Sequence, residues 1–169
     1  MSFAIRDATV EDLPAIDAIY AHEVLHGVAT FDTEPRRPEE SRAWFALLRE
    51  RGLPLRVACD AAGEVIGYAS LSPWSPRPAY SITAETSIYI AADRRGGGIG
   101  RALLEDLIAR AEERPLELLL ARIESGGAAS IHLHIAAGFR PVGTLHGVGR
   151  KFGRLLDVEI LERRLPRSS

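Results

Sequence analysis

Apolar residues recur at intervals of three and four positions in four stretches of the chain, which is the spacing of helices that bury one face. These stretches predict helices that begin near residues 10, 38, 99 and 128. Thr9 and Asp12 resemble a capping box in front of the first of them. We expect the first helix to bury Val10, Leu13, Ile16, Ile19, Tyr20 and Val24, and the second to bury Trp44, Leu47 and Leu48.

Shorter stretches around these helices have the alternation and length of strands. They predict strands close to residues 3–5, 55–59, 64–72, 84–90, 116–123, 139–145 and 155–165. The turn residues 60–63 lie between the second and third strands and favour an antiparallel hairpin. The predicted order is β-α-α-β-β-β-α-β-α-β-β, which is a mixed α/β arrangement.

The composition is that of one folded domain spanning residues 1–169, with 46% apolar and 26% charged residues. A total of 21 Lys and Arg residues against 23 Asp and Glu gives a net charge of −2, and the basic residues are scattered. Nothing in this distribution indicates a nucleic-acid or anionic membrane partner. No apolar run reaches the roughly 18 residues of a membrane span.

Cys59 is the only cysteine, which excludes an internal disulfide and a multi-cysteine zinc site. It alternates with Leu55 and Val57 in a predicted strand, so we expect it to be a structural residue. The first dozen residues contain acidic side chains where a secretion signal would be basic and then apolar. These features predict a cytoplasmic protein without a bound metal.

A glycine-rich segment, Arg95-Gly96-Gly97-Gly98-Ile99-Gly100, lies between a predicted strand and a predicted helix. Its peptide N–H groups would converge with the positive end of the helix dipole, which favours binding of a phosphate. Arg101-Ala102 follows where a nucleoside-triphosphate loop requires lysine and a hydroxyl residue, and the glycine spacing does not fit a dinucleotide fingerprint. A plain flexible turn is the alternative.

A second irregular segment, residues 72–83, contains three prolines together with Trp74, Arg77 and Tyr80. Proline at this density cannot continue the interior of a sheet, and it favours a stiff exposed loop. Loops of this kind often hold substrates.

The glycine segment fits the Arg/Gln-x-x-Gly-x-Gly/Ala pattern of the GCN5-related N-acetyltransferases, the GNAT superfamily. Several separate motifs resemble its phosphinothricin and methionine sulfoximine N-acetyltransferase branch: Phe31-Asp32-Thr33-Glu34-Pro35, Gly67-Tyr68-Ala69, Pro73-Trp74, Ala79-Tyr80, residues 83–89, residues 128–131 and Lys151-Phe152-Gly153. The resemblance implies the GNAT fold, a mixed and mostly antiparallel sheet of about seven strands flanked by four helices. It also implies a homodimer with active sites close to the subunit interface.

The resemblance implies transfer of acetyl from acetyl-CoA to the primary amine of a small amino acid, by direct attack on the thioester. The pyrophosphate of CoA is expected on the backbone of Gly96, Gly97, Gly98, Ile99, Gly100 and Arg101. The pantetheine arm is expected along Ile88, Tyr89 and Ile90, in the manner of an added strand. The N–H group of Ile88 could also face the developing oxyanion.

Glu85 is the candidate base, because only the neutral amine attacks a thioester and this glutamate falls on the catalytic position of the branch. The alternative is a solvated carboxylate on a strand. His134, on the last predicted helix, is the candidate donor of a proton to the departing thiolate or an assistant of Glu85. The alternative for His134 is a packed helix histidine with one hydrogen bond.

Arg77, Tyr80 and Lys151 are the candidates for contact with the anionic groups of an amino-acid substrate, and Arg77 is the strongest of them. Ordinary solvated charge is the alternative, more so for Lys151. Phe31 and Trp74 could wall the pocket, or could be core or dimer-contact aromatics.

Two departures from the branch stand out. Gly127 takes the place of an asparagine that offers its amide to the CoA arm, and Arg122 interrupts an otherwise apolar strand. Two alternative functions therefore stay open. One is acetylation of another small amine or of a peptide N-terminus, and the other is a non-catalytic acyl-CoA-binding module.

Overall fold

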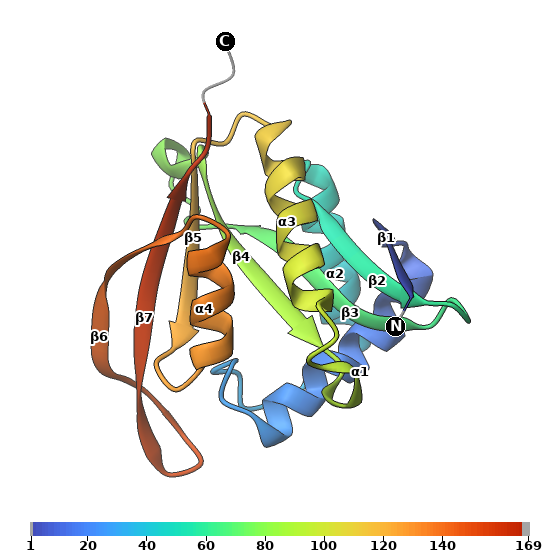
Figure 1. Cartoon of the computed structure of the whole chain (residues 1–169), viewed down its shortest axis with the longest axis horizontal. Helices are drawn as coiled ribbons and strands as arrows, with labels where there is room; N and C mark the ends of the chain where they lie inside the picture. The colour runs from blue at the N-terminus through green and yellow to red at the C-terminus, as the bar shows by residue number, and fades with distance from the viewer. Residues whose placement is uncertain (1, 167–169) are drawn as a thin grey trace.

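The structure, a computed structural model, describes residues 2–166 and is built on one seven-stranded sheet in the order β1-β2-β3-β4-β5-β7-β6 (Figure 1). Its strands are β1 (Phe3–Asp7), β2 (Leu55–Asp60), β3 (Val65–Pro73), β4 (Thr83–Ile90), β5 (Leu118–Glu124), β6 (Arg140–Lys151) and β7 (Arg154–Arg164). Every neighbouring pair is antiparallel except β4 and β5, which are parallel. The expected mixed and mostly antiparallel sheet is confirmed.

Four α-helices cover the two faces of the sheet: α1 (Leu13–His26), α2 (Pro38–Glu50), α3 (Ile99–Glu112) and α4 (Ala128–Ala136). The helices α1 and α2 pack over β2 and β3 on one face, in a core that also buries Cys59. The helices α3 and α4 lie on the other face, in front of the sheet in Figure 1. Two separate cores therefore hold the sheet between them.

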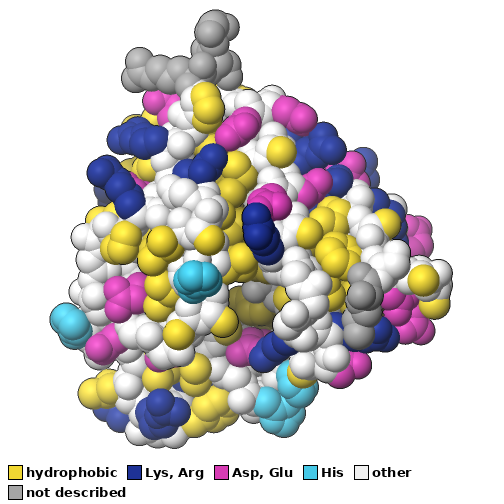
Figure 2. Space-filling model, in the orientation of Figure 1, with side chains coloured by type: hydrophobic (Ala, Val, Ile, Leu, Met, Phe, Trp, Pro, Cys, Tyr) yellow, Lys and Arg dark blue, Asp and Glu magenta, His cyan; other side chains and the backbone are white. Residues whose placement is uncertain are grey.

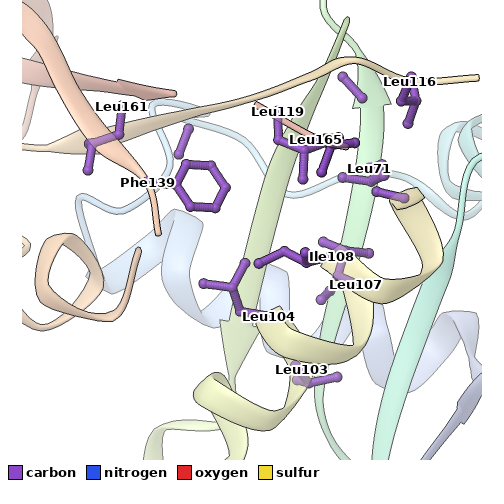
Figure 3. Close-up of a cluster of buried hydrophobic side chains, with 14 of the residues drawn as sticks. Leu71, Leu103, Leu104, Leu107, Ile108, Leu116, Leu119, Phe139, Leu161 and Leu165 are labelled. Carbon is purple, nitrogen blue, oxygen red and sulfur yellow. The ribbon is translucent and has the colours of Figure 1, made fainter. Parts of the chain in front are cut away.

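The larger core is organised around α3. Leu103, Leu104 and Leu107 are fully buried and point from this helix toward leucines of the sheet, among them Leu71 of β3 and Leu119 of β5 (Figure 3). Burial of each such side chain contributes about 1.5–3 kcal/mol, which makes α3 the main packing element of this face. Its position also fixes the glycine segment that precedes it.

Two side chains expected in the core are exposed. Val10 has an exposed fraction of 48% because residues 10–12 form a short 3-10 turn in front of α1, out of phase with the apolar face of that helix. Leu47 has an exposed fraction of 39%, because α2 buries Phe45 and Leu48, one turn apart, instead. The capping box of Thr9 and Asp12 is present, at the start of the 3-10 turn.

The strand β6 is longer than the sequence pattern predicts, whereas β7 has the predicted length and is shifted by one residue. The strand β6 runs over twelve residues to Lys151, beyond the expected end near residue 145, and most of it is exposed. As the edge strand of the sheet it has only β7 as a neighbour, so its residues lack the burial pattern on which the sequence prediction depends.

Candidate active site

The parallel strands β4 and β5 separate after a short stretch. They pair only where Thr83–Glu85 meets Leu118–Leu120, and β4 then continues to Ile90 with β3 alone as its partner. Figure 1 shows the two strands diverging toward the lower part of the view, and Figure 2 shows the surface hollowed between α3 and α4. One backbone edge of residues 86–90 therefore faces a gap in the sheet, and this stretch contains the expected cofactor-binding residues Ile88, Tyr89 and Ile90.

The glycine segment forms a tight turn at the side of this gap. Gly96 and Gly98 have φ angles of +83° and +79°, in the left-handed region that only glycine adopts without strain. Gly98 caps α3, and the N–H group of Ala102 is the first to bond back into the helix, to the Gly98 oxygen at 3.1 Å. The N–H groups of residues 98–101 are thus the unpaired donors of a helix start, where an anion is stabilised.

The space around this turn has room for a ligand. A Cβ atom built on Gly96 or Gly98 meets no atom within 4 Å, and one on Gly97 meets only the Arg94 oxygen at 3.9 Å. Gly100 faces Leu133 of α4 and Ile90 of β4, so it borders the gap between the strands. The side chain of Arg101 turns to Glu105 on the helix surface, so Arg101 can offer the site its backbone N–H group.

Arg95 fastens the turn to the rest of the protein. Its guanidinium donates to Glu23 Oε2 at 2.9 Å, and its Nε donates to the Ile90 oxygen at 3.4 Å. The Glu23 side chain is nearly buried at the end of α1, whereas that of Arg95 is 56% exposed. The contact with Glu23 could not be predicted from local sequence patterns, because the two residues are 72 positions apart.

Glu85 is the last residue of β4 that pairs with β5, and the gap begins after it. Its carboxylate accepts two hydrogen bonds from Arg122 of β5, from Nε at 2.6 Å and from Nη2 at 2.7 Å. The pair raises the pKa of the Arg122 guanidinium, which also lies 5.3 Å from the ring centroid of Trp74. The side chain of Glu85 is only 15% exposed, so it is not the solvated carboxylate of the alternative interpretation.

His134 lies on the opposite face of β4 from Glu85. It is buried, its Nδ1–H donates to the Ser130 oxygen at 2.8 Å, and its Nε2 is 3.3 Å from the hydroxyl of Thr86, the residue after Glu85. Burial lowers the pKa of the imidazole, which favours the neutral ring with its proton on Nδ1. Direct assistance of Glu85 has no support here, because successive strand residues point to opposite faces.

Lys151 is buried, so the alternative of a solvated charge is wrong for this residue. Its ammonium donates to the Thr30 oxygen at 2.8 Å and to the Glu23 oxygen at 3.5 Å, and burial lowers its pKa. The contacts tie the end of β6 to the connection between α1 and α2. Phe31, in the same connection, places its ring against the backbone of Gly149 on β6.

The phenol of Tyr20 anchors the same connection from α1. It donates to Asp32 Oδ2 at 2.6 Å and bonds the Thr30 hydroxyl at 2.8 Å, while its ring packs edge-on against Tyr89 of β4. Burial and the neighbouring Asp32 carboxylate raise the pKa of Tyr20 to about 12. The segment around Phe31 is thereby fixed to the α1 face of β4, the face on which Glu85 lies.

Arg77 and Tyr80 are placed apart from this assembly. They line a cavity of about 320 Å³ together with Arg51, Arg114 and Leu116, and Glu85 does not contribute to its wall. Trp74, from the same proline-rich loop, is the member that reaches the Glu85 region, through Arg122. The structure thus divides the expected substrate residues into two groups.

Gly127 begins α4 through its backbone. Its N–H group donates to the Glu124 oxygen at 2.8 Å, and its own oxygen accepts from Ile131 at 3.0 Å. A Cβ atom there would lie 3.0 Å from the Glu124 oxygen and 3.2 Å from Ile123 Cγ2, so a larger residue requires a shift of the turn.

Two further findings concern the described part of the chain. Within residues 2–166, no three His, Cys, Asp or Glu side chains are grouped so that they could hold a metal ion. No helix among these residues is long and apolar enough to cross a membrane.

Comparison of the sequence with known proteins assigns the chain to a protein family. Residues 17–139 match the model of the acetyltransferase (GNAT) family, and the chain belongs to that family. It is 46% identical over 165 residues to the L-methionine sulfoximine/L-methionine sulfone acetyltransferase of Pseudomonas aeruginosa, covering 98% of this chain and 96% of that one.

Solved structures agree with this assignment. A GNAT superfamily phosphinothricin acetyltransferase from Sinorhizobium meliloti, in complex with acetyl-CoA, superposes with a TM-score of 0.95 at 39% identity, covering 98% of this chain and 89% of that one. A ribosomal-protein-alanine N-acetyltransferase from Brucella melitensis has a TM-score of 0.92 at 42% identity, covering 96% and 99%. The expected GNAT membership and fold are confirmed.

Proposed function

We propose that the protein transfers the acetyl group of acetyl-CoA to the primary amine of a small amino acid such as methionine sulfoximine, methionine sulfone or phosphinothricin. The observation that carries the proposal is the gap between β4 and β5, with Glu85 where the strands separate and the N–H groups of the start of α3 near Ile90, further along β4. The names of the similar proteins from Pseudomonas aeruginosa and Sinorhizobium meliloti support this substrate class.

Acetyl-CoA would supply the activated acyl group, and the residues around the gap fit it. The backbone of residues 96–101 offers unpaired donors and open space to a pyrophosphate, and the free edge of Ile88, Tyr89 and Ile90 offers strand-like bonds to an extended amide chain. Glu85 would take the proton of the ammonium group, and the N–H group of Ile88 would face the oxyanion. Phe31 and Trp74 would border the amine site.

His134 is the proposed second catalytic residue, the source of the proton for the departing thiolate. For this role the imidazole would have to be protonated at Nε2, which is 3.3 Å from the Thr86 hydroxyl, because the only proton of the neutral ring is on Nδ1 and is donated to the Ser130 oxygen. A packed histidine without a catalytic role is the competing interpretation, and its support is the burial of the ring and the engagement of both ring nitrogens.

The assembly and location are also proposals. A homodimer is supported by the β6–β7 hairpin, which exposes Val142, Val148, Phe152 and Leu155 on the sheet edge. Light scattering at several protein concentrations measures the mass directly. The lone unpaired Cys59 supports a reducing compartment, the cytoplasm.

One second function has a specific observation in its favour. The similar protein from Brucella melitensis carries the name of an enzyme that acetylates ribosomal-protein alanine, so a peptide N-terminus is a candidate acceptor for this chain as well. A peptide with an N-terminal alanine belongs in the first substrate panel for this reason.

The test is thiol release from acetyl-CoA with methionine sulfoximine, methionine sulfone, phosphinothricin and the peptide as acceptors. We expect release that depends on the amino acid and is weak or absent with the peptide. The reverse ranking would replace the proposed substrate class by a peptide N-terminus. Calorimetric binding of CoA without turnover of any acceptor would instead support the non-catalytic acyl-CoA-binding module.

A further inference from the structure

The ion pair of Glu85 and Arg122 has an unusual position for a surface salt bridge. The pair spans the two diverging strands where the gap begins, since Glu85 is paired with Leu120 and Arg122 is two residues further along β5 on the same face. The side chain of Arg122 is 54% exposed and stacks near Trp74, while Glu85 is largely covered. The cation is therefore the accessible half of the pair.

The guanidinium of Arg122 has N–H donors that Glu85 does not use. Nε and Nη2 are committed to Glu85, whereas Nη1 has no acceptor among residues 2–166. Arginine binds carboxylates through two parallel N–H donors, so the outer edge of this guanidinium can receive a second carboxylate. The Glu85 carboxylate likewise has lone pairs beyond the two that Arg122 occupies.

We infer that Arg122 binds the α-carboxylate of the amino-acid substrate while Glu85 receives its α-ammonium group. The inference rests on the proposed function, because it takes the acceptor to be a free amino acid. An α-amino acid carries both charges on one carbon, and Arg122 and Glu85 present the two complementary charges in direct contact. Binding would exchange one ion pair within the protein for two with the substrate.

The cost of that exchange is small for two reasons. A partly exposed ion pair contributes little net stability, so loosening it costs little. Trp74 lies over the guanidinium and would hold it in place while its partner changes. Arg77, the residue that the sequence favoured for this task, lines the separate cavity with Arg51 and Arg114 and does not contact Glu85.

The discriminating measurement compares two acceptors that differ only in the carboxylate, methionine sulfone and its decarboxylated amine. In the Arg122→Ala variant we expect KM for methionine sulfone to rise by about tenfold to a hundredfold, the usual cost of a lost charge-assisted bond, with KM for the amine within about twofold of its original value. Arg122→Lys should restore part of the preference. A structural role would shift both acceptors equally, and that result overturns the inference.

Arg6→Ala is the matched control. Arg6 forms a bidentate pair with Asp12 at the far edge of the sheet, with side chains 46% and 9% exposed, and it should leave the ratio of the two KM values unchanged. Arg77→Ala tests the competing assignment. If this variant, and not Arg122→Ala, abolishes the preference for the carboxylate, Arg122 is not the binding residue.

Calorimetry separates this inference from the proposed function. Methionine sulfone is titrated into the CoA-bound wild-type protein and into the CoA-bound Arg122→Ala variant. Binding that depends on Arg122 without acetylation would refute the proposed function and support the inference. Acetylation that does not depend on Arg122 would do the opposite, and no binding of the amino acid overturns the inference.

Discussion

The side chain of Glu85 is only 15% exposed, yet it lies beside the gap at which β4 and β5 separate. Low exposure and access to a ligand are seldom found together in one carboxylate. Its pairing with Arg122 explains how a carboxylate persists there without being solvated. A carboxylate without an ion-pair partner would be expected at the surface, and a carboxylate buried in the core would be inaccessible to a substrate. The ion pair instead keeps the Glu85 carboxylate at the edge of the gap and leaves the Arg122 guanidinium accessible.

The first prediction concerns Glu85→Gln, which keeps the shape of the side chain and removes its capacity to accept a proton. We expect kcat to fall by about 10²- to 10⁴-fold, the range for loss of general base catalysis, with the Kd of CoA changed by less than about twofold. Steady-state kinetics and calorimetry measure the two quantities. An equal loss in kcat and in CoA affinity would argue against the base role.

The contact of Glu85 with Arg122 shows what sequence reasoning missed at this scale. The motif around residue 85 identified the glutamate, and the charge at 122 was noticed as an interruption of an apolar strand. Their pairing joins residues 37 positions apart on parallel strands, and the register between such strands is not written in either segment. The burial of Lys151 could not be predicted for the same reason, because its acceptors lie on a distant connection.

At the scale of elements, the glycine turn is the part of the site that the sequence predicted best. A strand, a run of glycines and an amphipathic helix are local patterns, and each signals its own conformation. The separation of β4 from β5 is different, since it depends on how two strands that are far apart in the chain pair with each other and with their other neighbours. No local pattern marks the residue at which pairing stops.

Gly98→Ala tests the turn. The substitution forces a residue with a Cβ atom to a φ of +79°, which costs about 1–2 kcal/mol. We expect the backbone of the turn to shift in order to relieve this strain, and the affinity for CoA to fall as a result. Gly63→Ala is the control, because Gly63 has a φ of +84°, equally open surroundings and a place in the β2–β3 turn. Both variants should lose stability to urea, and only Gly98→Ala should raise the Kd of CoA.

A second pair of variants tests the contact between β6 and the α1–α2 connection. In Gly149→Ala the new Cβ atom would overlap the ring of Phe31, so we expect a loss of about 1–3 kcal/mol in the free energy of unfolding and a higher KM for the amine. Gly143→Ala, on the same strand with open space around it, should change neither. Equal behaviour of the two variants would mean that Phe31 does not depend on this contact.

At the scale of the whole molecule, we expect the two cores to respond differently to pH, because His134 is the one buried histidine among residues 2–166 and it packs against Phe139 of the α3–α4 core. His134 in the α3–α4 core has a lowered pKa, so the unfolded chain binds a proton below about pH 6.5 that the folded protein resists. The free energy of unfolding should therefore be constant for this group above that pH. It should fall as the pH decreases through the ordinary histidine value.

The expected slope is at most about 1.4 kcal/mol per pH unit for this one proton. Urea denaturation at pH 7.5, 6.5 and 5.5 measures it, and His134→Asn should remove that part of the decline. His132→Asn, on the exposed side of the same helix, is the control and should leave the slope as it is. A wild-type slope that survives in His134→Asn would assign the effect to other groups.

The short stretch of pairing between β4 and β5 has a mechanical consequence for the whole molecule. The sheet consists of a four-stranded half and a three-stranded half that are joined through residues 82–85 and 117–120, with α3 packed across both. A ligand that binds in the gap would contact both halves and add a further link between them. Protein with a bound ligand should then resist heating and proteolysis better than the empty protein, which lacks this additional link.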